Sequence, residues 1–67
     1  MTIYTSKQRI VVNHPVTVKA NYVTGGATYT IMCGPTRVRT YANANAAFAL
    51  VQQINKAFLE GQKIMSI

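Results

Sequence analysis

The chain has 67 residues, of which 49% are hydrophobic and 12% are charged. This length is enough for one domain, residues 1–67, with a thin core that buries roughly 60% of the surface of the unfolded chain, and the composition excludes a disordered basic tail. Seven Lys and Arg residues against one acid, Glu60, give a formal net charge of +6, which predicts a nucleic acid, an acidic protein surface or an anionic membrane as the partner.

The first residues, Met1 to Tyr4, lack the charged start and the apolar segment of a signal peptide. No apolar run reaches the roughly 20 residues of a membrane span. The one cysteine, Cys33, has no partner for an internal disulfide, and it lies in an apolar run where a buried thiol is expected. We therefore expect a cytoplasmic protein that does not bind membranes.

Four segments rich in Val, Ile, Thr and Tyr predict β-strands at residues 3–12, 16–23, 27–33 and 37–41. The breaks between them predict turns at Asn13-His14-Pro15, Gly25-Gly26 and Gly34-Pro35. A two-residue Gly25-Gly26 loop places Tyr22 opposite Tyr29, Ala20 opposite Ile31 and Val18 opposite Cys33. A three-residue loop before it pairs Val12 with Val16, Ile10 with Val18 and Gln8 with Ala20. Both pairings direct one mainly apolar set to the same face.

From Ala44 to Glu60, apolar residues recur at helical spacing and predict one amphipathic helix, with Asn55 on its polar side. Asn43 is expected to cap the first turn, Tyr41 to pack just before it, and Gly61 to end the helix. Residues 62–67 are left open, because Ile64, Met65 and Ile67 can add an edge strand, complete the core or pack on a partner subunit.

The predicted fold class is α+β: a small antiparallel sheet of three to four strands in hairpin order, packed on one C-terminal helix (ββββα). The predicted core contains Val16, Val18, Tyr22, Tyr29, Ile31, Val51, Ile54 and Phe58. The core is thin and several apolar residues remain outside it, so we also expect a homodimer. A C-terminal tail folded back over its own sheet is the alternative.

Strand alternation assigns five of the seven basic residues to the sheet face that the helix leaves free. These candidate binding residues are Lys7, Arg9, Lys19, Arg37 and Arg39. A polyanion-binding face is the functional interpretation, and a solvated sheet face is the structural one. No Asp or Glu is assigned to this face, and this absence favours binding. Arg37 and Arg39 are expected to project in parallel, unless a bulge near Tyr41 turns Arg39 sideways.

Most aromatic residues are assigned to the core, which leaves Tyr4 and Tyr41 as surface rings. One carboxylate, one His and one Cys cannot supply an acid/base pair, a metal cage or a supported triad. His14 is interpreted as a turn residue. We therefore expect no enzyme activity, no metal and no cofactor.

Residues 29–57 run through a strand, a Gly-Pro turn, the strand Arg37 to Tyr41 and an Ala-rich helix. This order resembles the end of small sheet-plus-helix DNA-binding domains, namely the AP2 and integrase arm-binding domains. The resemblance implies a sheet that enters the major groove with the helix behind it, and Lys19, Arg37 and Arg39 as outward residues. It covers less than half of the chain, and the conserved tryptophans and arginines of the plant domains have no counterpart here.

The expected function is non-enzymatic nucleic-acid binding through the exposed sheet face. The alternative is a phage-encoded inhibitor, similar in size and style to anti-CRISPR proteins, that docks the same basic face on an acidic surface of a host defence or nucleic-acid-processing complex. The two functions differ in how binding depends on salt, because phosphate contacts release counterions.

Overall fold

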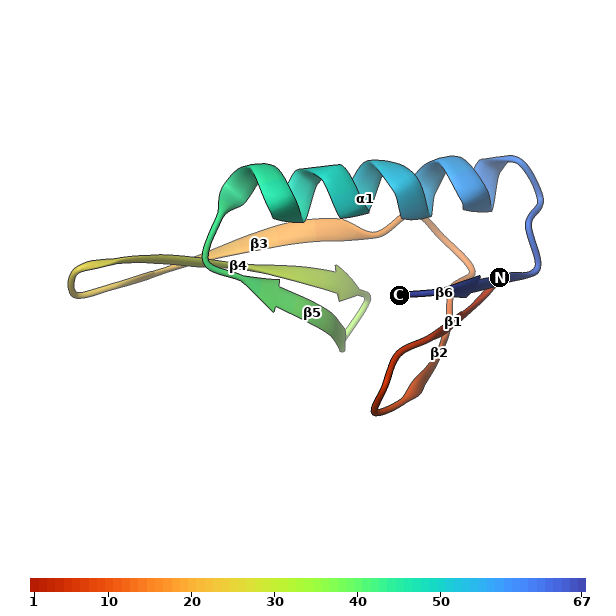
Figure 1. Ribbon diagram of the computed structural model, residues 1–67, viewed down its shortest axis with the longest axis horizontal. Helices are drawn as coiled ribbons and strands as arrows, with labels where there is room; N and C mark the ends of the chain where they lie inside the picture. The colour runs from red at the N-terminus through yellow and green to blue at the C-terminus, as the bar shows by residue number, and fades with distance from the viewer.

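The longest strands of the computed structural model, which describes residues 1–67, form one antiparallel sheet in the order β3-β4-β5 (Figure 1). Its strands are β3 (Thr17–Val23), β4 (Gly26–Cys33) and β5 (Thr36–Tyr41). The helix α1 (Ala44–Leu59) lies across one face of this sheet. The predicted α+β class, with an antiparallel sheet packed on a C-terminal helix, is therefore confirmed.

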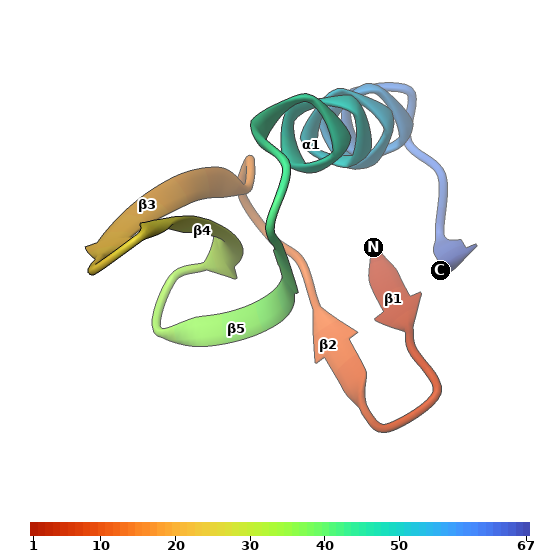
Figure 2. The same ribbon diagram turned by 60° about the vertical axis from the view of Figure 1, so that its left-hand side comes forward.

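A second sheet, with the order β2-β1-β6, lies beside the first (Figure 2). Its strands are β1 (Thr2–Tyr4), β2 (Arg9–Val11) and β6 (Ile64–Ser66), with β6 parallel to β1. The C-terminal segment therefore forms an edge strand, one of the three alternatives that the sequence left open. The α1 helix is not long and apolar enough to cross a membrane.

The prediction of one strand over residues 3–12 is wrong, because a polar turn divides this segment. The hydroxyl oxygen of Thr5 accepts hydrogen bonds from the backbone N–H groups of Lys7 and Gln8, at 3.2 and 3.0 Å. The chain therefore reverses, and Ile3 pairs with Ile10 within the second sheet. The predicted pairs of residues 8–12 with residues 16–20 do not form, and residues 13–15 connect the two sheets.

The hairpin of β3 and β4 turns at Thr24-Gly25 instead of Gly25-Gly26. Gly25 has the positive φ of +87° that the turn requires. Ala20 consequently pairs with Tyr29, and Val18 with Ile31, two residues away from the predicted register. Because strand side chains alternate with a period of two, this shift keeps every residue on its predicted face.

The helix begins and ends close to the predicted residues. The side chain of Asn43 accepts hydrogen bonds from the backbone N–H groups of Asn45 and Ala46, so the predicted N-cap is confirmed. Gly61 adopts the left-handed conformation just after the helix, with φ of +79°. Asn55, predicted on the polar side, instead bonds the backbone of Val16: its Oδ1 accepts from Val16 N–H at 2.8 Å, and its Nδ2 donates to Val16 C=O at 3.2 Å.

The core joins α1, both sheets and the turn between them. Its members are Ile3, Ile10, Val12, Val16, Ile31, Cys33, Val38, Leu50 and Ile54. Burial of Cys33 and of three predicted core residues is confirmed, whereas the predicted burial of Tyr22 is wrong. Tyr22 lies on the predicted face but is 80% exposed. The reason is that the β3–β4 hairpin extends beyond the first turn of α1 (Figure 1).

Candidate functional site

The face of the β3-β4-β5 sheet that points away from α1 is here called the outer face. Cross-strand partners share a face, so the register defines its members. They are Thr17, Lys19, Asn21, Val23, Thr28, Thr30, Met32, Arg37 and Thr40. Each position follows from the register, and the two cations come from the two edge strands, with β4 between them. The outer face carries basic and neutral polar side chains, the apolar side chains of Val23 and Met32, and no acid.

An open pocket of about 280 Å³ lies on the outer face. It is lined by Lys19, Asn21, Thr30, Met32, Pro35 and Arg37. Lys19 is directly opposite Thr30, and Arg37 is directly opposite Met32, so the two cations flank β4 diagonally. The Thr30 hydroxyl lies 3.1 Å from the Thr40 hydroxyl. The pocket therefore offers an ammonium, a guanidinium, an amide and a hydroxyl around a small apolar patch.

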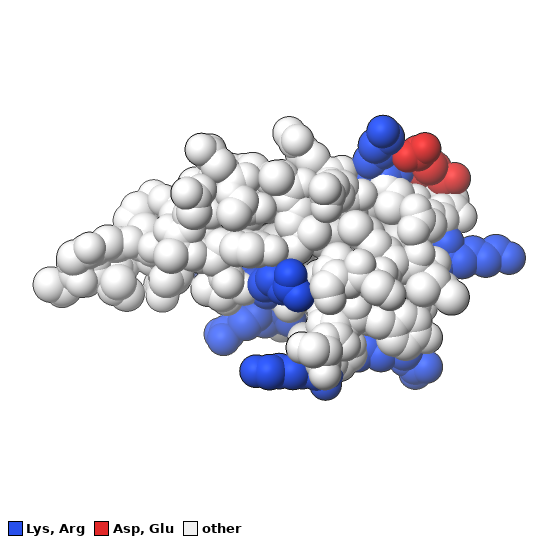
Figure 3. Space-filling model, in the orientation of Figure 1, with Lys and Arg blue, Asp and Glu red and all other residues white.

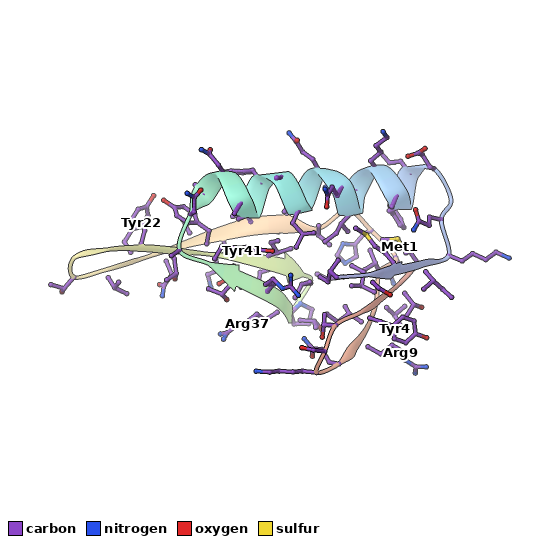
Figure 4. All side chains as sticks on the ribbon, viewed as in Figure 1. Met1, Tyr4, Arg9, Tyr22, Arg37 and Tyr41 are labelled. Carbon is purple, nitrogen blue, oxygen red and sulfur yellow. The ribbon has the colours of Figure 1, made fainter.

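The second sheet is fastened to the rim of the outer face by Gln8. The Gln8 Nε2 donates to the backbone C=O of Arg37 at 2.9 Å. This bond holds the turn that carries Lys7 against β5, so Lys7 lies at the rim instead of on a strand. Figure 4 shows Arg9 and Arg37 pointing to the side of the molecule opposite α1. Four of the five predicted site residues therefore lie on this side of the molecule. Lys19 and Arg37 belong to the outer face, and Lys7 and Arg9 lie at its rim, which is the 5–8 turn and β2 of the second sheet.

Arg39 does not belong to the outer face, so its assignment to that face is wrong, and the bulge that the sequence analysis gave as the alternative to a parallel projection is present. A β-bulge between Ile31 and Met32 leaves Val38 without a partner and places Arg39 opposite Ile31, on the helix side of the sheet. Arg39 is half-buried, and its guanidinium donates to the Tyr41 hydroxyl at 3.4 Å. Burial of Val38 explains the bulge, because this apolar side chain turns into the core.

Charge is distributed unevenly over the molecule. Figure 3 shows most of the Lys and Arg side chains on the side of the molecule away from α1, whereas the one acidic residue lies at the end of α1 with one basic side chain beside it. That residue is Glu60, the C-cap of the helix. No carboxylate neutralises the basic side of the protein, so this side presents an uncompensated positive field.

Two tyrosines are exposed enough to contact a partner. Tyr4 is 41% exposed and directly opposite Arg9 in the second sheet, and Figure 4 shows the two side chains next to each other. Tyr22 is 80% exposed on the hairpin. The sequence analysis assigned Tyr22 to the core, although its place beside the Gly25 turn was a signal that the strand ends far from the helix. Tyr41 is half-buried against the core.

The remaining reactive side chains, outside the outer face, do not form a cluster. No three His, Cys, Asp or Glu residues lie together as metal ligands. The Cys33 thiol is buried and donates to the Val11 carbonyl at 3.6 Å, and His14 Nδ1 lies 3.0 Å from the Pro15 carbonyl oxygen. Comparisons with protein-family models, with curated proteins and with solved structures found no match.

Proposed function

We propose that this protein binds nucleic acid through the outer face, as a non-enzymatic module. The observation that supports it is the pocket between Lys19 and Arg37, which combines two cations with the donors of Asn21 and Thr30 and has no acid in its lining. Phosphate oxygens are the ligands that such a group of donors suits. Lys7 and Arg9 belong to the same hairpin of the second sheet, and they add phosphate contacts at the β5 side of the outer face.

The two cations have different roles in this proposal. Arg37 presents a planar fork that donates two parallel hydrogen bonds to one phosphate, whereas Lys19 acts as a mobile point charge. They lie on strands separated by β4 and are offset by two residues along the sheet, so their backbones are about 12 Å apart. The outer face holds no exposed aromatic ring, so contacts with the phosphate backbone dominate over base stacking, and we expect little sequence preference.

The test is a mobility-shift titration against random duplex and single strands at two salt concentrations. The double variant Lys19→Ala/Arg37→Ala is compared with Lys56→Ala/Lys63→Ala, which removes the same charge from exposed positions on α1 and just before β6. We expect the first variant to lose affinity at least about tenfold, or 1.4 kcal/mol, and the second to lose much less.

Two outcomes would contradict the proposal. Equal losses in both variants would mean that net charge binds the nucleic acid and that the outer face has no special role. No shift of the wild type at low salt would remove nucleic-acid binding and favour the acidic protein surface of a phage-type inhibitor. A protein target would give one partner and a weaker salt dependence.

Two further expectations belong to this proposal. A free buried thiol suits a reducing compartment, which supports a cytoplasmic location. Exposed Tyr22, on the sheet edge strand β3, supports a homodimer.

A further inference from the structure

The β3 strand has a neighbour on one side only, and its one charged residue is Lys19. Six of its seven residues are exposed, and it contains neither a proline nor a bulge. The opposite edge strand, β5, carries a bulge and two arginines, and Gln8 bonds its Arg37 carbonyl. Bulges, charges and covering groups are the usual means of blocking edge pairing. One edge of this sheet is blocked, and the other is open.

The contact of Asn55 with Val16 shows which groups of β3 are free. The Asn55 side-chain amide bonds both the N–H and the C=O of Val16, so the backbone of Val16 points to the free edge. In an antiparallel ladder, the N–H and C=O groups of successive residues point alternately to the two edges of the strand. Val18, Ala20 and Tyr22 therefore direct their N–H and C=O groups to the same edge. Asn55 supplies the hydrogen bonds for Val16, and the backbone groups of the next three residues that face this edge have no partner strand.

We propose that a second copy of this chain pairs with β3 in antiparallel orientation, about a two-fold axis that passes beside Ala20. Ala20 then lies opposite the partner's Ala20, and Val18 lies opposite the partner's Tyr22 on both sides of the axis. Each of these three pairs exchanges two backbone bonds, which gives about six hydrogen bonds. The pairing extends the sheet to six strands, with both helices on one side.

The sequence of β3 is self-complementary in this register, as a two-fold interface requires. Lys19 faces the partner's Asn21, so no like charges are directly opposite. Tyr22, which is 80% exposed in one copy, packs on the partner's Val18 on the helix side. Shifting the axis to Lys19 would oppose two lysines and lose one pair. Shifting it to Asn21 would lose one pair and leave Val18 without its aromatic partner.

The dimer has a consequence for binding that rests on the proposed function. A two-fold axis perpendicular to the sheet places the two outer faces on the same side, with the Lys19 residues of both copies near the axis. One nucleic acid could then contact both pockets, which raises affinity through effective concentration. The pairing itself does not depend on nucleic acid.

Sedimentation velocity without nucleic acid tests the pairing. We expect self-association at high micromolar concentration that strengthens with salt, because salt screens the repulsion between copies that each carry +6. Nucleic-acid binding has the opposite salt dependence, so the two proposals fail independently. Tyr22→Lys should weaken the dimer about tenfold or more. The control Leu59→Lys, with the same charge change at a residue of 77% exposure, should not.

A disulfide experiment tests the register and does not depend on the Tyr22 variant. Lys19 and the partner's Asn21 form a non-bonded pair with Cα atoms about 4.5 Å apart, within reach of a disulfide. A mixture of the Lys19→Cys and Asn21→Cys proteins should cross-link under mild oxidation, and each protein alone should cross-link far more slowly. Three results would overturn the proposal. The first is a wild type that stays monomeric at about 1 mM and high salt. The others are an equal weakening of the dimer by Tyr22→Lys and Leu59→Lys, and a mixture of the two cysteine proteins that cross-links no faster than each protein alone.

Discussion

Arg37 and Arg39 are only two residues apart, but the bulge at Val38 gives them different surroundings. Arg37 is exposed beside the pocket, whereas Arg39 is half-buried and bonded to Tyr41. The bulge therefore places one arginine of β5 on the proposed binding face and the other in a contact on the helix side of the sheet. Charge alone would treat them as equal.

The two arginines should consequently respond differently to alanine substitution. We expect Arg37→Ala to weaken nucleic-acid binding about three- to tenfold and to leave stability unchanged, because one charge-assisted phosphate contact is lost. Arg39→Ala should change binding less and reduce thermal stability. Fluorescence anisotropy with a labelled random duplex and thermal unfolding measure the two effects. A larger binding loss for Arg39→Ala would show that the helix side, not the outer face, meets the partner.

Asn55 is a second residue whose position explains its contribution. It sits on α1 but supplies the hydrogen bonds that a neighbouring strand would give to Val16. Its side chain therefore links the helix to the start of β3, and it closes the edge of the sheet at that point.

Replacing Asn55 with Ala should lower the free energy of unfolding by about 1–3 kcal/mol, because the partly buried Val16 groups lose both partners. Alanine has the higher helix propensity, so helix formation cannot account for a loss. Urea unfolding measures it, with Gln53→Ala at an exposed position of α1 as the control. Equal stability of the two variants would mean that water replaces the amide without cost.

At the level of elements, one feature of the second sheet could be predicted from nearby residues and one could not. The turn at residues 5–8 had a signal: in one continuous strand, Ile3 and Ile10 would point to opposite faces, yet both are buried. The parallel pairing of β6 with β1 had none, because it joins the two ends of the chain. The helix and its caps were predictable because their signals are local.

The side of the sheet on which most candidate site residues lie could be predicted because side chains alternate along a strand. The hairpin register was wrong by two residues, which equals the side-chain period, so Lys19 stayed on its assigned face. The bulge shifts β5 by one residue, which moved Arg39 to the other face. The face assigned to a residue by strand alternation therefore stays correct when the register shifts by two residues, and it becomes wrong when a bulge shifts the strand by one.

The β6 strand offers a prediction about stability. Met65 is half-buried opposite Ile3, whereas Ile64 is 58% exposed. Met65→Ala should cost about 1–2 kcal/mol of unfolding free energy, and Ile64→Ala about 0.5 kcal/mol or less, because only the first removes packed atoms. Chemical denaturation compares them. A larger loss for Ile64→Ala would place the opposite face of β6 in the core.

At the level of the whole molecule, the core and the proposed binding surface lie on opposite sides of the β3-β4-β5 sheet. The helix and the core occupy one side of the β3-β4-β5 sheet, and the outer face and its rim carry four of the seven basic residues. The hairpin extends the molecule to 39 Å along its longest axis, against 21 and 18 Å along the others. The tip of the hairpin carries no charged residue, so the basic side chains lie on the broader part of the molecule. An open basic surface of this kind suits contact with a polymer more than enclosure of a small ligand.

The molecule should therefore bind nucleic acid with a modest salt dependence. Two to four phosphate contacts from Lys7, Arg9, Lys19 and Arg37 predict a slope of log K against log salt of about −2 to −4 for a duplex. Anisotropy titrations over a range of salt concentrations measure the slope, and Lys19→Ala should reduce its magnitude by about one. A slope near zero would exclude phosphate contacts as the main interaction.

The most direct test of the central claim is an NMR titration of the labelled protein with a random oligonucleotide at low salt. We expect amide shifts to concentrate in β3, β4 and β5 around Lys19, Asn21, Thr30 and Arg37, with smaller changes at Lys7 and Arg9. Residues on the exposed side of α1 should not shift. Shifts confined to α1, or none at millimolar oligonucleotide, would contradict the assignment of the outer face as a nucleic-acid-binding surface.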